Sequence, residues 1–170
     1  MVEHQGFAEF YEAEHGRVVT SLLLATGRTD TARDAADEAF LRALMAWPRV
    51  QRMDSPAGWT FRVALNVVRR RERRRSLERR LLARKAPTPD VPAPAGEAWA
   101  LVAELPERQR TAVVLRFVAD LTEHQIAEAM GISRSTVSST LADAKRRLAG
   151  SLEEEPDPAG GRHATGGHHG

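Results

Sequence analysis

A proline-rich segment at residues 86–96 divides the chain and constrains its fold more than any other feature. It reads Ala-Pro-Thr-Pro-Asp-Val-Pro-Ala-Pro-Ala-Gly, and its four prolines remove backbone donors and favour extended polyproline II structure over a helix. We therefore expect a linker that separates two small domains, residues 1–85 and residues 97–150. Residues 151–170 are acidic and then rich in Gly and His, which predicts a disordered tail.

Apolar residues recur with helical spacing on both sides of this linker, and no segment alternates as a half-buried strand does. In the first helix, for example, Phe7, Tyr11, Val18 and Leu22 fall on one face. The predicted fold class is therefore all-α, with two small helical domains. The expected helices cover residues 7–26, 31–47, 56–84, 97–104, 107–119, 123–130 and 134–149.

Composition excludes several classes of protein. The 170 residues include no cysteine, which rules out a disulfide scaffold, a thiolate zinc site and a cysteine nucleophile. No apolar run approaches the roughly 18 residues of a membrane span, and residues 1–6 carry neither a basic nor an apolar signal segment. We therefore expect a cytoplasmic protein without membrane insertion.

Charge is unevenly distributed, although its total is only +2. Residues 51–85 carry 12 basic and 3 acidic side chains, a net charge of +9, whereas residues 1–50 carry 5 basic and 8 acidic side chains, a net charge of −3. A strongly basic segment between acidic ones is typical of a surface that binds a polyanion, with nucleic acid as the leading candidate. A solvated arginine-rich helix face gives the same pattern, so charge alone leaves both interpretations open.

The basic segment contains a regular polar stripe. Arg62, Asn66, Arg69 and Arg73 are spaced 4, 3 and 4 residues apart, which places them on one face of the predicted helix 56–84. Arginines neutralise phosphates, and the amide of Asn66 can both donate to and accept from a base edge. These four residues are the predicted DNA contacts of this helix, and the alternative for Asn66 is the ordinary polar residue that a helix tolerates. The loop before the helix, residues 49–55, suits an unstacked base as well as it suits an ordinary connection.

The predicted helix 31–47 has two unlike faces. Its inner face is expected to contain Ala36, Phe40, Leu44 and Trp47. Its outer face combines carboxylates with apolar side chains: Asp34, Asp37, Glu38, Leu41 and Met45. Such a mixture of carboxylates and exposed apolar groups is unusual on a face that is merely solvated.

Residues 121–148 have the pattern of a DNA-binding helix-turn-helix. Thr122 and Gln125 are spaced as a capping box, and Gly131 supplies a left-handed residue that ends the first helix. Ser133 then caps a second helix, which in this motif enters the major groove with its N-terminus first. The side chains predicted to bind DNA are Arg134, Ser135, Thr136, Ser138 and Ser139, with Lys145 on phosphates. A plain helical hairpin is the alternative interpretation.

With these motifs in this order, the chain resembles the extracytoplasmic-function sigma factors, the smallest class of the bacterial sigma-70 family. Residues 7–84 resemble the family's region 2, and residues 97–148 resemble region 4. The residues that carry the resemblance are Asp34, Glu38, Phe40, Leu41 and Arg42; Trp59, Arg62, Val63, Ala64 and Asn66; and Leu105-Pro106-Glu107-Arg108-Gln109-Arg110, Leu115, Arg116 and the helix-turn-helix. The family often has Gln in place of Asp37 and a basic residue in place of Leu65. The second departure predicts the weakening of one backbone contact.

The resemblance implies a division of labour. The helix with the acidic and apolar face (Asp34, Asp37, Glu38, Leu41 and Met45) docks on the clamp coiled coil of RNA polymerase. The basic helix and its preceding loop open and read the −10 element, and the last helix reads the −35 element as a duplex. The implied partners are core RNA polymerase and promoter DNA, and an anti-sigma factor is a further candidate partner. No cofactor, metal or catalytic residue is implied.

Two other function classes stay open. A two-domain transcriptional regulator that binds duplex DNA as a dimer explains the helix-turn-helix, but it gives the acidic helix and the +9 segment no role. An enzyme would need a built site. The histidines that could bind a metal, His163, His168 and His169, lie in the Gly-rich tail without supporting ligands, so we expect adventitious metal affinity and no enzyme activity.

Overall fold

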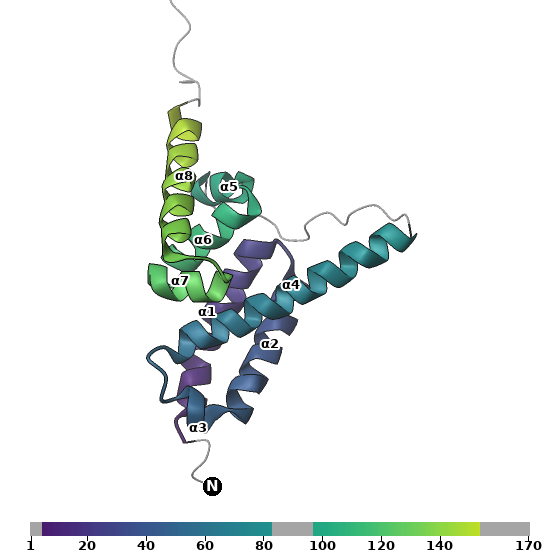
Figure 1. The fold of residues 1–170 in the computed structure, drawn as a ribbon, viewed down its shortest axis with the longest axis vertical. Coiled ribbons are helices and arrows are strands. Elements are labelled where there is room, and N and C mark those ends of the chain that lie inside the picture. The colour runs from purple at the N-terminus through teal and green to yellow at the C-terminus, as the bar shows by residue number, and fades with distance from the viewer. Residues whose placement is uncertain (1–4, 83–96, 154–170) are drawn as a thin grey trace, which may run out of the picture.

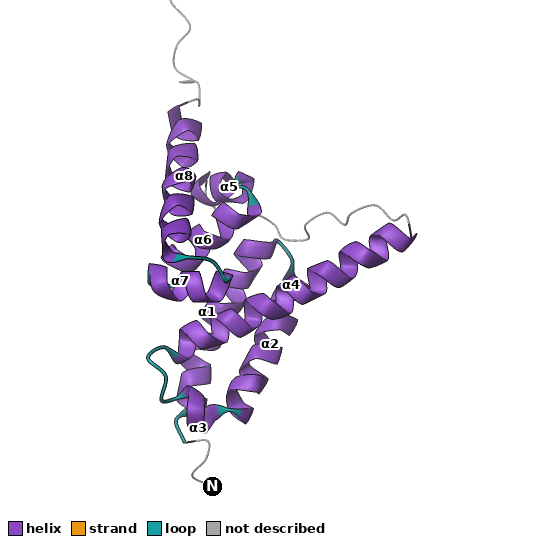
Figure 2. Ribbon diagram, viewed as in Figure 1, coloured by secondary structure: helices purple, strands orange, loops and turns teal. Residues whose placement is uncertain are grey.

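The computed structural model describes residues 5–82 and 97–153 (Figure 1). Every regular element within these ranges is a helix, which confirms the predicted all-α fold class (Figure 2). The helices are α1 (Phe7–Thr26), α2 (Thr29–Met45), α3 (Trp47–Val50), α4 (Pro56–Leu82), α5 (Glu97–Glu104), α6 (Glu107–Phe117), α7 (Glu123–Met130) and α8 (Arg134–Glu153).

Four helix ends differ from the prediction within the described residues, and two of them differ by only two residues: α2 begins at Thr29, and α6 ends at Phe117. α2 ends at Met45 because residues 47–50 form the separate short helix α3. Pro48 lacks a backbone N–H and suits the first turn of a new helix, which accounts for the break. At the other end of the chain, α8 continues through Gly150 to Glu153, past the predicted end at residue 149.

The N-terminal half is built from α1, α2 and α4, with α3 closing one end (Figure 1). Val18, Leu22, Ala36, Phe40 and Phe61 are almost completely buried between these helices. An aromatic cluster extends this core toward α3, where the indole N–H of Trp47 donates to the carbonyl of Gln5 at 2.8 Å. Of the predicted inner faces, Tyr11 is 39% exposed and Leu44 is half-buried, so both lie at the rim.

The C-terminal half contains α5 to α8. Leu105, Val113 and Ala144 form a small buried cluster of their own, with Val102 and Leu148 packed against it. Ile126 of α7 and Val137 of α8 are fully buried, which fixes the two helices of the helix-turn-helix against each other.

The two halves share one core. Leu22 and Phe61 from the first half belong to the same buried cluster as Leu115, Ile126 and Val137 from the second. α1 packs against α6, and α4 packs against α7 (Figure 1). The linker predicted at residues 86–96 lies outside the described residues, as does the tail from residue 154. The sequence pattern predicts two domains, and the structure places them in direct contact.

Candidate nucleic-acid interface

The polar stripe predicted on α4 exists because the opposite side of the helix is buried. Phe61, Ala64, Leu65 and Val68 point into the core. On the stripe, Asn66 and Arg73 are exposed, whereas Arg62 and Arg69 are half-buried. Arg69 Nη1 lies 3.4 Å from Asn66 Oδ1 and donates to it, so neighbouring members of the stripe contact each other.

Arg69 also contacts the other half of the molecule. Its Nη2 donates to the carbonyl of Met130 at 2.8 Å, and its Nη1 lies 3.5 Å from the carbonyl oxygen of Ala129. Burial lowers the pKa of Arg69, the positive charge of Arg73 adds to this effect, and Glu107 opposes it. The guanidinium still stays charged at neutral pH because its ordinary pKa is so high. One member of the predicted DNA stripe is thus bound to α7 in this structure.

The loop before α4 forms one wall of a cavity of about 490 Å³. That wall consists of residues 52–55 together with Gly58, Trp59 and Arg62. The opposite wall belongs to α7 and its N-cap: Thr122, His124, Gln125 and Glu128. The sequence singles out the loop, but it gives no local signal for the α7 wall, because a contact between segments so far apart leaves no periodic pattern.

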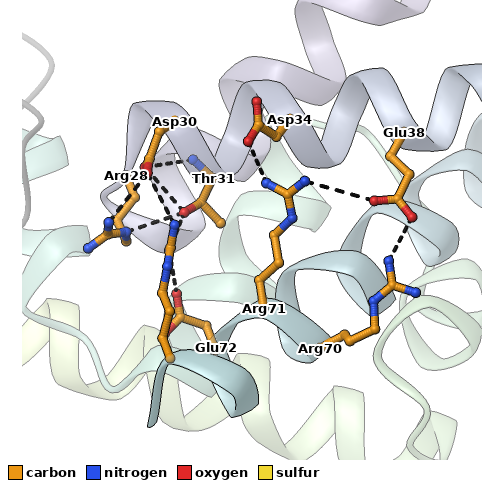
Figure 3. Close-up of polar contacts among 9 residues, drawn as sticks. Arg28, Asp30, Thr31, Asp34, Glu38, Arg70, Arg71 and Glu72 are labelled. Carbon is orange, nitrogen blue, oxygen red and sulfur yellow. Dashed lines mark hydrogen bonds and ion pairs between the residues drawn. The ribbon is translucent and has the colours of Figure 1, made fainter. Parts of the chain in front are cut away.

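Two carboxylates of the predicted α2 docking face are bound to arginines of α4 (Figure 3). Arg71 Nη1 donates to Asp34 Oδ2 at 2.6 Å, and Arg70 Nη2 donates to Glu38 Oε1 at 2.7 Å. These arginines are outside the predicted stripe. Part of the +9 charge is therefore paired with carboxylates of α2.

The rest of the docking face is open to solvent. Leu41 is 57% exposed and Met45 is 77% exposed. Asp37 is also exposed and lies 2.9 Å from Nε2 of His15 in α1, so no arginine of α4 holds it. The face therefore has a carboxylate and two apolar side chains that a partner can reach.

A third ion-pair group joins the start of α2 to α4. Asp30 accepts the backbone N–H of Thr31 at 2.7 Å (Figure 3). It also accepts a hydrogen bond from Arg75 Nη2 at 3.1 Å. Partial burial acts to raise the pKa of Asp30, but the Thr31 bond and the charges of Arg28 and Arg75 outweigh it, so that the pKa lies below its ordinary value.

The helix-turn-helix has the caps that its sequence predicts. Thr122 Oγ1 accepts the N–H of Gln125 at 3.3 Å, and Gln125 Oε1 accepts the N–H of Thr122 at 2.8 Å, which completes the capping box. Gly131 has a left-handed φ of 67°. The N–H of Thr136 donates to Ser133 Oγ at 3.1 Å, so Ser133 caps α8. These contacts fix the angle at which α8 leaves the turn.

The predicted contact residues of α8 lie mostly in solvent. Exposed members are Arg134, Ser135, Ser138, Ser139 and Lys145, and Thr136 is half-buried. Glu123 of α7 contacts two of them: Ser138 Oγ donates to its Oε2 at 2.6 Å, and Arg134 Nε lies 3.6 Å from the same oxygen. Most of the N-terminal side chains of α8 can therefore reach a ligand.

An apolar groove between α5, α6 and α8 is a surface that the sequence analysis missed. Its volume is about 810 Å³, and its lining includes the apolar side chains of Trp99, Val102, Phe117, Leu148 and Leu152. Phe117 is 75% exposed and Leu152 is 62% exposed. Contiguous exposed apolar surface of this kind marks a protein-binding site. Phe117 and Leu152 sit at helix ends, where the apolar period gives no sign of exposure.

Two negative findings apply to residues 5–82 and 97–153. No helix there is both long enough and apolar enough to cross a membrane. No group of three or more candidate metal ligands occurs in that part of the chain. His163, His168 and His169 lie outside the described residues.

Two family models match the chain in the order that the sequence analysis expects. The model described as Sigma-70 region 2 matches residues 10–78, and the model described as Sigma-70, region 4 matches residues 95–148. RNA polymerase sigma factor SigF of Mycobacterium tuberculosis is 51% identical over 53 residues, which are 31% of this chain and 20% of that protein. The chain thus spans about a fifth of the length of the curated relatives it matches.

Solved structures with a similar fold include two complexes. The sigma factor RpoE in complex with the anti-sigma factor NepR from Bartonella quintana has a TM-score of 0.72 and 16% identity, over 88% of this chain and 98% of that chain. CnrH in complex with the cytosolic domain of CnrY has a TM-score of 0.62 and 18% identity, over 91% of this chain and 92% of that chain. At this level of identity, the likeness concerns the fold.

Proposed function

The chain belongs to the sigma-70 family, and on this premise we propose that it is an RNA polymerase sigma factor of the extracytoplasmic-function class. Residues 1–85 contact core polymerase and the −10 element, and residues 97–150 bind the −35 element. The observation that carries the proposal is the presence in one chain of an acidic and apolar α2 face and a fully capped helix-turn-helix. The chain selects the promoter and has no catalytic role.

The α2 face docks on polymerase in this proposal. Leu41 and Met45 supply apolar surface, which is worth about 25 cal/mol for each Å² removed from water. Asp37 supplies a charge that a basic partner can reach. Asp34 and Glu38 contribute less to the attraction, because their pairing with Arg71 and Arg70 offsets most of their negative charge.

The α4 stripe contacts the −10 element. Asn66 is exposed and reads a base edge, while Arg62, Arg69 and Arg73 contact phosphates. Trp59 borders the cavity beside Arg62 and offers a ring on which an unstacked base can lie. Binding through phosphates makes this contact strongly dependent on salt.

The N-terminus of α8 contacts the −35 duplex. The positive end of the helix dipole favours a phosphate there, and Arg134 adds a charge. Ser135, Thr136, Ser138 and Ser139 supply hydroxyls for phosphates and bases. Lys145, farther along the exposed side of α8, contacts phosphate.

Residues 86–96 join the two DNA contacts. A proline-rich linker keeps the second domain near its target once the first is bound, which turns two weak contacts into one strong one through effective concentration.

Reconstituted transcription tests the proposal. Core RNA polymerase, the full chain and a set of native promoter fragments are expected to give initiation at defined start sites, and core polymerase alone is not. The multiple variant Arg134→Ala, Ser135→Ala and Ser138→Ala is the matched control, since it disables −35 binding and leaves the α2 face intact. A well-folded chain that binds duplex DNA but never activates core polymerase would instead support the dimeric regulator.

We further propose a protein partner of the anti-sigma class. RpoE, to which this fold is similar, was solved with such a partner, and the groove lined by Trp99 and Phe117 is a surface that an apolar helix can fill. A pull-down with the full chain from the native cell tests this, with Phe117→Glu as the matched variant. Recovery of core polymerase without any inhibitor by the parent chain would argue against it.

A further inference from the structure

Two arginines join the halves of the molecule in a reciprocal way. Arg69 of α4 donates to the carbonyl of Met130, the last residue of α7, at 2.8 Å. Arg110 of α6 donates from Nε to the carbonyl of Ala25, in the last turn of α1, at 3.0 Å. Each half therefore supplies one cation that caps the C-terminus of a helix in the other half.

A helix C-terminus is a suitable partner for such a cation. Its last four carbonyls lack intrahelical donors, and the helix dipole gives this end a partial negative charge. At a helix C-terminus a guanidinium can donate to several oxygen atoms that carry partial negative charge. A phosphate group also offers several negatively charged oxygen atoms. In this structure the protein's own backbone satisfies Arg69 as DNA would.

α7 covers part of the DNA stripe of α4. Across the 490 Å³ cavity, Gln125 and Glu128 of α7 face Arg62, and the C-terminus of α7 holds Arg69. The approach is close at the start of α4, where a Cβ added to Gly58 would lie 3.5 Å from Cγ of Gln125. The part of the −10 surface around Arg62 and Arg69 therefore faces the first helix of the helix-turn-helix, whereas Asn66 and Arg73 stay exposed.

The contact between the halves is only partly packed. Leu65, Val68 and Met130 are 4%, 6% and 8% exposed, but a cavity of about 420 Å³ lies beside them. Arg69 and Glu107 also line this cavity. Because this cavity is open to solvent and partly lined by charged side chains, the shared core does not extend across the whole contact, and less apolar surface has to be exposed when the halves separate.

We propose that the free chain holds itself closed, with Arg69 as a latch that exchanges the carbonyls of Ala129 and Met130 for DNA phosphates when the halves separate. Arg110 is the second part of the latch. Closure opposes DNA binding by the free chain, and a partner that binds the separated form removes this opposition. The DNA part of the inference rests on the proposed function, whereas the closed state does not.

Distance measurements on the free chain test the closed state. The chain contains no cysteine, so Ala13→Cys and Ala149→Cys, both at exposed positions, accept one spin label in each half. Double electron–electron resonance is expected to give one narrow distance distribution in the absence of DNA and polymerase. A broad distribution with long distances would overturn the proposal.

Arginine variants in this labelled chain identify the latch. Arg110→Ala removes one charged cap, which is expected to shift the ratio of closed to open molecules about tenfold and to add a longer distance. Arg69→Ala is expected to do the same from the other half. Arg33→Ala, an exposed arginine of α2, is the control and keeps the narrow distribution. Unchanged distances in both latch variants would overturn the proposal.

Circular dichroism separates opening from unfolding. Arg110 also donates to Ala103 and Leu105 in its own half, so loss of helix in Arg110→Ala would leave Arg69→Ala to decide the outcome. Besides the carbonyls of α7, Arg69 contacts Asn66 within α4 through a long hydrogen bond of 3.4 Å, so Arg69→Ala disturbs its own half less.

Binding of single-stranded oligo(dT) tests the DNA part. Arg110→Ala is expected to bind about tenfold more tightly than the parent chain, because Arg69 is released while every stripe residue is retained. Equal affinity of Arg110→Ala and the parent chain for oligo(dT) would overturn the proposal that Arg69 exchanges backbone carbonyls for DNA phosphates. Neither readout uses polymerase, so failure of the transcription assay leaves this result unaffected.

Discussion

Asp37 is the carboxylate of α2 that a partner can capture most easily. Asp34 and Glu38 are bound to guanidinium groups of α4, at 2.6 Å and 2.7 Å, whereas Asp37 faces the imidazole of His15 at 2.9 Å. An imidazole offers Asp37 a single hydrogen bond, whereas a guanidinium carries five donors in a rigid fork. Spacing on the helix makes the three carboxylates look equivalent, and only their neighbours distinguish them.

Reversal of this charge should weaken polymerase binding. We expect Asp37→Arg to raise the Kd for core polymerase about tenfold, because a new like charge faces a basic surface. Fluorescence anisotropy of the labelled chain measures the affinity. Glu12→Arg, the same charge change at an exposed position of α1, is the control. Equal affinity of Asp37→Arg and the control would remove Asp37 from the docking face.

Arg73 allows a cleaner test of the DNA stripe than Arg69, whose removal also opens the molecule. Arg73→Glu is expected to slow promoter opening about tenfold and to leave polymerase affinity nearly unchanged, because it adds repulsion from phosphates. Permanganate reactivity of the −10 region follows opening. Arg74→Glu is the matched control, since Arg74 lies off the stripe and pairs with Glu78 at 3.0 Å. Equal loss in both variants would show that total charge matters and that the stripe does not.

At the scale of elements, one backbone conformation sets the angle between α7 and α8. Gly131 has a φ of +67°, which is strained for any residue with a Cβ. Gly150 lies within α8, and a Cβ placed there meets no other atom within 4 Å. The backbone at residue 131 therefore favours glycine, whereas the backbone and the space at residue 150 accept a side chain.

Alanine at these two positions should shift stability in opposite directions. We expect Gly131→Ala to lower the free energy of unfolding by about 1 kcal/mol. Gly150→Ala should raise it by up to about 1 kcal/mol, since alanine loses less backbone entropy in a helix. Urea unfolding followed by circular dichroism measures both. Two changes of the same sign would contradict this description of the turn.

The ion pairs between α2 and α4 predict a dependence of stability on pH. The pKa of Asp30 is lower in the folded chain, so its contribution is complete above the unfolded value of about 3.9 and disappears as pH falls through the folded value. At pH 7 we expect Asp30→Asn to lower the free energy of unfolding by less than about 1 kcal/mol, because the pair is exposed to solvent. The difference from the parent chain should shrink below about pH 4. Asp54→Asn in the exposed loop is the control, and an equal pH dependence in both variants would contradict the assignment.

At the scale of the whole molecule, the shared core predicts that the two halves stay together without a covalent link. A protease site inserted between residues 86 and 96 allows cleavage of the folded chain. We expect the fragments to elute together in size-exclusion chromatography, because Leu115 and Ile126 lose their buried surroundings when the halves separate. Transcription should fall, since effective concentration on the promoter is lost once the halves open. Separate elution at moderate protein concentration would contradict a closed free state.

Local features could be predicted from the sequence, and contacts between distant elements could not. The caps at Thr122 and Gly131 and the stripe on α4 follow from spacing within one helix. Leu65 illustrates the limit: its departure from the family pattern suggests a lost contact to the DNA backbone, yet its side chain is 4% exposed and lies beside Met130 of α7. Periodicity shows that a helix face is buried, but it does not say which helix covers that face.

The reciprocal caps at Arg69 and Arg110 also affect how such proteins can be recombined. A chimera that takes residues 5–82 from this chain and its other half from a relative keeps Arg69 but loses Arg110, along with the α7 end shaped to receive Arg69. The transplanted residues 5–82 then carry a cation whose partner in the other half is missing. Module exchange therefore changes resting behaviour together with promoter choice, and the two arginines must be transferred or removed as a pair.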